Sequence, residues 1–169
     1  EDNIFLTGFP LPEENIGGNN LKSLKNDLAE RVINLDPNHF YRQKYGSTVK
    51  QYLQDIKLGT KHHHPLTLTF AVGGAGAQRQ LGCEVLASLK HKLLKKQINL
   101  NLIAGSRNDV YLFFKDSIKE EGLEKILGKN LRIIFAVDKE DYFKEFNEVL
   151  RSTDILWTKP SELVFYCAF

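Results

Sequence analysis

The sequence predicts an α/β protein with a Rossmann-like three-layer sandwich, in which helices cover both faces of a mainly parallel sheet. From residue 66 onward, apolar β-favouring segments alternate with amphipathic helical patterns, at about thirty residues per strand–helix unit. The apolar run 66–72 leads directly into a loop of glycine and alanine, and a helical pattern follows from Arg79. Because consecutive parallel strands need right-handed helical crossovers, this alternation predicts a sheet that is covered on both sides.

Length and composition fit one ordinary globular domain. The chain has 169 residues, of which 42% are hydrophobic and 26% are charged, so it can bury a sizeable core. Its net charge of +2 provides no general field for holding nucleic acid, and we expect no nucleic-acid partner. No apolar run reaches the length of a membrane span, and no signal peptide opens the chain.

The two cysteines, Cys83 and Cys167, both lie in apolar helical patterns. A small buried thiol is commoner in such a context than a disulfide, so we expect a reducing, cytoplasmic setting. The chain contains no Met and stops directly after an apolar run, and we interpret it as a piece of a longer protein.

Residues 1–65 form a predicted lead-in segment. The apolar run at 4–6 predicts a short strand, and prolines with small polar residues predict a loop from there to residue 20. Apolar residues at three- and four-residue spacing predict one helix over 21–35 and a second over 40–56. Neither helix carries a pattern that suggests chemistry, so we interpret both as packing, lid or linker elements.

Three adjacent histidines, His62 to His64, precede the first strand of the sheet. Neighbouring side chains point in different directions, and no second cluster of ligands lies nearby in the sequence. A solvated loop is therefore favoured over a metal site.

Residues 66–169 form the predicted Rossmann-like domain, and a polar loop follows each of its strands. The carboxyl ends of parallel strands share one edge of the sheet, where ligands bind at the point at which the strand order reverses. The predicted strands span 66–72, 98–104, 131–137 and 155–157, and the helices between and after them begin near Arg79, Val110, Asp138 and Glu162, with a helical turn at 123–127. The stretch 138–141 is the predicted cap of the third of these helices.

The loop after the first strand of this domain carries only one heavy side chain, at its end. It consists of Gly73, Gly74, Ala75, Gly76, Ala77 and Gln78. Without side chains, backbone N–H groups can approach a ligand closely, and the helix start adds unpaired donors with partial positive charge. This pattern favours an anion site, although a tight turn without ligand is the ordinary alternative for a strand–helix loop.

Two further loops at the same edge carry hydroxyl groups and cations. They contribute Ser106 and Arg107 after the second strand and Thr158, Lys159, Pro160 and Ser161 after the fourth. Hydroxyls, a lysine and helix-start amides suit a diphosphate or a sugar. Each residue also has a structural alternative, as a helix cap, a surface charge or a first-turn proline.

The glycine loop does not complete the known nucleotide fingerprints. Arg79 stands where a dinucleotide site has its third glycine, and no acidic residue ends the second strand. A P-loop would need Gly-Lys followed by Ser or Thr, which is absent. NAD and an oxidoreductase function are therefore disfavoured.

Three stretches resemble the donor-binding, carboxy-terminal domain of GT-B glycosyltransferases of the family 28 type, which includes the peptidoglycan N-acetylglucosaminyltransferase and the diacylglycerol glycosyltransferases. The run from Phe70 to Gln78 is similar to their strand and glycine-rich loop. The stretch Thr153 to Pro160 resembles their alanine-aspartate, apolar strand and Thr-Lys-Pro pattern, and Thr7 to Pro10 resembles the segment that opens their domain.

The resemblance implies a nucleotide-sugar donor, usually linked to UDP, and hexosyl transfer to an acceptor. It implies that the diphosphate lies at the glycine loop and at the helix after the fourth strand, and that Val137 lies beside the base. Glu162 is then a candidate to replace the family's ribose-binding glutamate. No cofactor is expected, and no metal, because the chain has no Asp-x-Asp pair.

The catalytic base is not identified by this sequence. The family's acceptor site and usual base belong to an amino-terminal domain that is missing here, so we expect this fragment alone to be inactive. The acceptors implied by the resemblance include membrane lipids, which would associate the full-length protein with a membrane. A second hypothesis is a non-catalytic nucleotide or sugar-phosphate binding module, because Ser161 and Glu162 replace the family's glycines.

Overall fold

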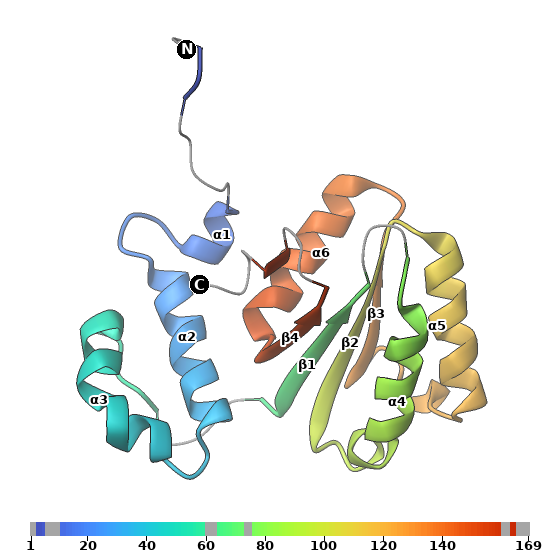
Figure 1. Ribbon diagram of the computed structural model, residues 1–169, viewed down its shortest axis with the longest axis horizontal. Coiled ribbons are helices and arrows are strands. Elements are labelled where there is room, and N and C mark those ends of the chain that lie inside the picture. Colours follow the sequence, from blue (N-terminus) through green and yellow to red (C-terminus); the bar gives the residue numbers. More distant parts are fainter. Residues whose placement is uncertain (1–2, 6–10, 60–63, 73–75, 160–162, 165–169) are drawn as a thin grey trace.

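The computed structural model describes residues 3–5, 11–59, 64–72, 76–159 and 163–164 (Figure 1). The elements are α1 (Glu13–Ile16), α2 (Lys22–Leu35), α3 (Phe40–Leu53), β1 (Leu66–Ala71), α4 (Arg79–Leu94), β2 (Ile98–Gly105), α5 (Asn108–Glu120), the 3₁₀ helix η1 (Glu124–Ile126), β3 (Leu131–Phe135), α6 (Lys139–Ser152) and β4 (Ile155–Thr158).

The four strands form one parallel sheet in the order β3-β2-β1-β4. In the register of this sheet, Phe70 of β1 lies between Leu102 of β2 and Trp157 of β4. Helices α4 and α5 cover one face, and α6 covers the other (Figure 1). The predicted Rossmann-like α/β class is therefore confirmed.

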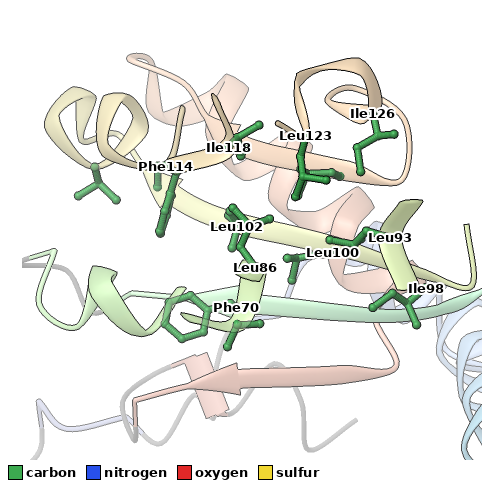
Figure 2. Close-up of a cluster of buried hydrophobic side chains, with 14 residues drawn as sticks. Phe70, Leu86, Leu93, Ile98, Leu100, Leu102, Phe114, Ile118, Leu123 and Ile126 are labelled. Atoms are coloured by element: carbon green, nitrogen blue, oxygen red, sulfur yellow. The ribbon is translucent and has the colours of Figure 1, made fainter. Parts of the chain in front are cut away.

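The main core lies between the sheet and the helices α4 and α5 (Figure 2). The side chains of Leu86, Leu102 and Phe114 come from three different elements and are fully buried. A smaller cluster on the opposite face includes Ile134 of β3 and Phe146 of α6. The carboxyl halves of β1 and β2 are continuously apolar, as expected for a parallel sheet that is buried on both faces. In their amino halves, apolar residues alternate with Thr67, Thr69, Asn99 and Asn101.

Helix α2 contacts the end of α6 through hydrogen bonds and an ion pair. Arg31 of α2 donates from Nε to the carbonyl of Thr153 at 2.7 Å and from Nη2 to the carbonyl of Leu150 at 2.8 Å. These carbonyls end α6, where a helix leaves its last acceptors unpaired and favours a cation. Asp27 of α2 also pairs with Arg151 at 2.8 Å.

The lead-in segment differs from the prediction at two places. Ile4 and Phe5 belong to no strand and are 82% and 80% exposed, because none of the described strands lies beside them to pair with. Leu6 lies outside the described residues. The predicted loop contains α1, whose first-turn carboxylates Glu13 and Glu14 follow Pro12 and which ends at Gly17 in the left-handed conformation.

Several predicted boundaries shift by a few residues. Helix α3 ends at Leu53 rather than near residue 56, and β3 ends at Phe135 rather than at Val137. The start of α4 at Arg79 is confirmed. The last helix, predicted from Glu162, falls mostly outside the described residues, of which Leu163 and Val164 adopt 3₁₀ geometry.

His64 is not the solvated side chain that the sequence suggested. Its Nδ1 lies 2.9 Å from the carbonyl of Pro65 and 3.8 Å from Oδ2 of Asp154, so a polar cluster between α2 and the sheet holds it in place. His62 and His63 lie outside the described residues.

Candidate functional site

The strand order reverses between β1 and β4. The chain leaves β1 through α4 toward β2 and β3, and then returns through α6 on the other face to β4 (Figure 1). Ala71, the last residue of β1, pairs with Thr158, the last residue of β4. The loops after these two strands therefore start side by side, at the kind of position where ligands bind in open parallel α/β sheets.

The start of α4 presents backbone donors at this position. Gln78 adopts a left-handed conformation as N-cap, and its side chain makes no capping hydrogen bond. Between described residues, no hydrogen bond uses the amide of Gly76, Ala77 or Gln78 as donor. These amides, together with the helix start, are donors of the kind that bind an anion. Gly73, Gly74 and Ala75 lie outside the described residues.

The fold requires glycine at position 76, for a reason that could not be seen in the sequence. Its φ is +70°, and a Cβ atom there would lie 2.9 Å from Cγ2 of Val110 and 3.4 Å from Nε of Arg107. The position therefore needs glycine both for its left-handed backbone and for close packing against the start of α5. This requirement holds with or without a ligand.

Arg107 lies beside Gly76 and pairs with a carboxylate at the start of α5. Its Nε and Nη2 donate to the two oxygens of Asp109, each at 3.1 Å, and Nη1 of Arg79 donates to Oδ2 of the same carboxylate at 3.0 Å. The hydrogen bond from Arg107 is the main cause that lowers the pKa of Asp109. Ser106, the neighbour predicted with Arg107, is exposed.

Sequence reasoning missed Arg79 and Asp109 as members of this cluster. Arg79 was considered only as a residue that spoils the dinucleotide fingerprint, yet its guanidinium also stacks 4.7 Å over the ring of Phe113. The available signal was the spacing, since Asp109 follows Arg107 by two residues and opens the same helix.

Val137 lies at the same edge and is 82% exposed. The helix that follows it is capped internally, because one carboxylate oxygen of Asp138 accepts from the amides of Glu140 and Asp141 at 2.8 and 3.2 Å. The predicted cap at Asp138 is confirmed. Because this cap occupies two backbone amides, the start of α6 has fewer unpaired N–H donors than the start of α4.

The loop after β4 begins with Thr158 and Lys159. The Thr158 hydroxyl donates to the carbonyl of Lys159 at 3.3 Å, and Lys159 itself is exposed. The structure thus brings Gly76 to Gln78 and Thr158 to Lys159 to the same edge of the sheet as Arg107. Pro160, Ser161 and Glu162 lie outside the described residues.

The described residues include no group of three or more His, Cys, Asp or Glu side chains arranged to hold a metal ion. In the same part of the chain, no helix combines the length and the apolar character needed to cross a membrane. Cys83 is a free thiol, and Cys167 lies outside the described residues.

Comparison with known proteins adds no relative. No family model matches the chain, and neither the curated proteins nor the solved structures contain a match to it. The fold and the geometry at the carboxyl edge of the sheet therefore carry the functional argument.

Proposed function

We propose that the chain is the donor-binding domain of a GT-B glycosyltransferase and holds the diphosphate of a nucleotide sugar, with UDP as the expected nucleotide. The observation that carries the proposal is the pairing of Ala71 with Thr158 at the point where the strand order reverses. The two stretches of sequence that carry the family resemblance continue from these two paired strand ends, which supports a shared binding position.

The donor and cationic groups at this edge of the sheet support binding of a diphosphate, which is a dianion. Amides at the start of α4, the guanidinium of Arg107 and the ammonium group of Lys159 all belong to the same edge of the sheet. In sugar transfer, negative charge builds on the departing nucleoside diphosphate. Fixed donors of this kind would stabilise that charge more in the transition state than in the ground state, which is how they would accelerate transfer.

The remaining parts of the reaction are assigned to protein outside this chain. The acceptor, for which a membrane lipid is one candidate, and the catalytic base would come from an amino-terminal domain. Within this chain, Val137 would lie beside the nucleotide base, and Ser106 would offer a hydroxyl group near Arg107.

Calorimetric titration of the 169-residue chain with UDP, a UDP-sugar, ADP and NAD tests the proposal. We expect UDP and the UDP-sugar to bind, and Lys159→Gln to weaken this binding about tenfold through loss of a charge-assisted contact. Lys119→Gln is the matched control, because Lys119 lies in the last turn of α5, toward the opposite edge of the sheet, and is exposed. Binding of NAD alone would overturn the proposal.

A variant at Gly76 is not suitable for this test. A side chain there would collide with Val110 before it reached a ligand, so loss of binding would report on folding. The second candidate function is a non-catalytic nucleotide or sugar-phosphate binding module, which the replacement of the family's glycines by Ser161 and Glu162 favours. Protein that includes the acceptor domain and binds a UDP-sugar without transfer or hydrolysis would support it.

A further inference from the structure

Two guanidinium groups and one carboxylate meet beside Gly76. Oδ2 of Asp109 accepts from Nη1 of Arg79 at 3.0 Å and from Nη2 of Arg107 at 3.1 Å, while Oδ1 accepts from Nε of Arg107 at 3.1 Å. The same Nε of Arg107 would lie 3.4 Å from a Cβ atom on Gly76. The carboxylate thus engages both cations next to the proposed position of the diphosphate.

The arrangement matches the way in which guanidinium groups bind phosphate. Arg107 uses two parallel N–H donors toward the two oxygens of Asp109, and a second guanidinium adds a donor to one of them. Phosphate oxygens accept the same paired donors from arginine. A carboxylate in this position therefore makes the contacts that a phosphate group would otherwise make.

The cluster is accessible enough to exchange partners. The side chains of Arg79, Arg107 and Asp109 are 33%, 42% and 52% exposed, and ion pairs at this level of exposure contribute little to folding. The pair of Asp36 with Arg42 is a contrast, because its side chains are 8% and 14% exposed and fix the turn between α2 and α3. Separating Asp109 from its arginines therefore costs little.

We propose that Asp109 is an internal competitor for the phosphate of the ligand. In the free protein it holds Arg107 and Arg79, and a bound diphosphate takes over the paired donors of Arg107. This inference rests on the proposed function, because it requires that an anion binds at the start of α4.

The test compares the dissociation constants of inorganic pyrophosphate and UDP for the 169-residue chain and its Asp109→Asn variant, measured by calorimetry. The amide keeps the volume of the carboxylate and removes its charge. We expect both ligands to bind about threefold to fivefold more tightly to the variant, which corresponds to the upper part of the range for an exposed ion pair. Asp109→Ala, as a second variant, should shift the affinity in the same direction.

Asp116→Asn is the matched control. It removes the same charge from an exposed position of the same helix, about two turns further on, and should change affinity by less than about twofold. Arg107→Gln should weaken binding of both ligands. In the Arg107→Gln background, Asp109→Asn should increase the affinity by a smaller factor, because Asp109 has lost its main partner.

The outcomes separate this inference from the proposed function. If Asp109→Asn binds the ligands with unchanged or lower affinity while the wild type binds UDP, Asp109 only positions Arg107, and the competitor role is wrong while the proposed function stands. A gain of the same size for Asp116→Asn would reduce the effect to net charge and also overturn the inference. Absence of pyrophosphate and UDP binding in wild type and variants would overturn both.

Discussion

The backbone N–H of Thr67, in β1, donates to Oδ2 of Asp154, just before β4, at 2.8 Å. Nδ2 of Asn34, in α2, donates to both oxygens of the same carboxylate, at 3.1 and 3.0 Å. The Asp154 side chain is 0% exposed, and Nδ1 of His64 lies 3.8 Å from its Oδ2. One buried carboxylate thus joins β1, β4 and the lead-in helix α2 at the edge opposite the proposed site.

Removal of this carboxylate should destabilise the fold. Asp154→Ala leaves the amide of Thr67 and the side chain of Asn34 without their acceptor, so we expect the free energy of unfolding to fall by about 2–4 kcal/mol. Urea denaturation measures the change. Asp116→Ala, which removes an exposed carboxylate from α5, should stay within about 0.5 kcal/mol of the wild type. Equal stability of the two variants would contradict the role given to Asp154.

The same carboxyl group should make stability depend on pH. Burial is the largest effect on Asp154 and raises its pKa above the ordinary 3.8, although the hydrogen bonds from Thr67 and Asn34 and the charges of His64 and Arg31 oppose this. Between 3.8 and the raised value, the folded state therefore binds more protons than the unfolded state. Stability from this group is present at low pH and falls as the pH rises through that window.

Comparison with Asp154→Asn isolates this pH effect, with both proteins carrying His64→Gln so that the neighbouring imidazole is absent. The free energies of unfolding of the single variant His64→Gln and of the double variant are measured from about pH 3.5 to pH 6.5, and their difference is taken at each pH. As the pH rises, the protein that retains Asp154 should lose stability relative to the protein that carries Asp154→Asn. A flat difference, or one of the opposite slope, would show that the pKa is not raised.

Gly82 should not tolerate a methyl group. A Cβ atom at this position of α4 would lie 2.7 Å from Cε1 of Phe114 and 3.0 Å from Cε1 of Phe70, two rings that are held in the core. Gly82→Ala should therefore lower the free energy of unfolding by about 1–3 kcal/mol through overpacking. Gly46→Ala is the control, because open space surrounds Gly46 in α3, and it should be neutral or stabilising by up to about 1 kcal/mol.

The thiol of Cys83 should react slowly with disulfides. Burial is the main cause that raises its pKa, with a hydrogen bond from Ser117 acting in the opposite direction. In a Cys167→Ser background, its reaction with a disulfide reagent at about pH 7.5 should be slower than that of free glutathione, because less thiolate is present. A rate equal to that of glutathione would contradict this prediction.

The sequence was informative where local pattern and tertiary packing agree. The order of strands and helices after residue 66 followed from apolar runs and helical spacing, and the cap at Asp138 followed from its residue type. It was misleading where an element depends on a neighbour. The apolar residues Ile4 and Phe5 resembled a strand, but no described strand pairs with them. His64 lies in a loop as predicted, but its side chain is partly buried beside Asp154 and is not fully solvated.

The candidate site divides in the same way. A bare loop after β1 and a Thr-Lys loop after β4 could be found in the sequence, because glycine, hydroxyl and cationic residues indicate their chemistry by type. The ion cluster of Arg79 with Asp109 could not, because the two residues are thirty positions apart and belong to different helices. The collision that a side chain at Gly76 would suffer with Val110 was hidden for the same reason.

By itself, the sequence determined an alternating α/β chain, its helix starts and the kinds of group that follow its strands. These depend on residues close together in the chain, through hydrogen-bonding periodicity and side-chain shape. Only the tertiary structure decided that β4 returns to lie beside β1, that α2 is tied to Asp154 and that Asp109 engages two arginines. Those relationships join distant segments, and their geometry is set when the sheet and its covering helices pack together.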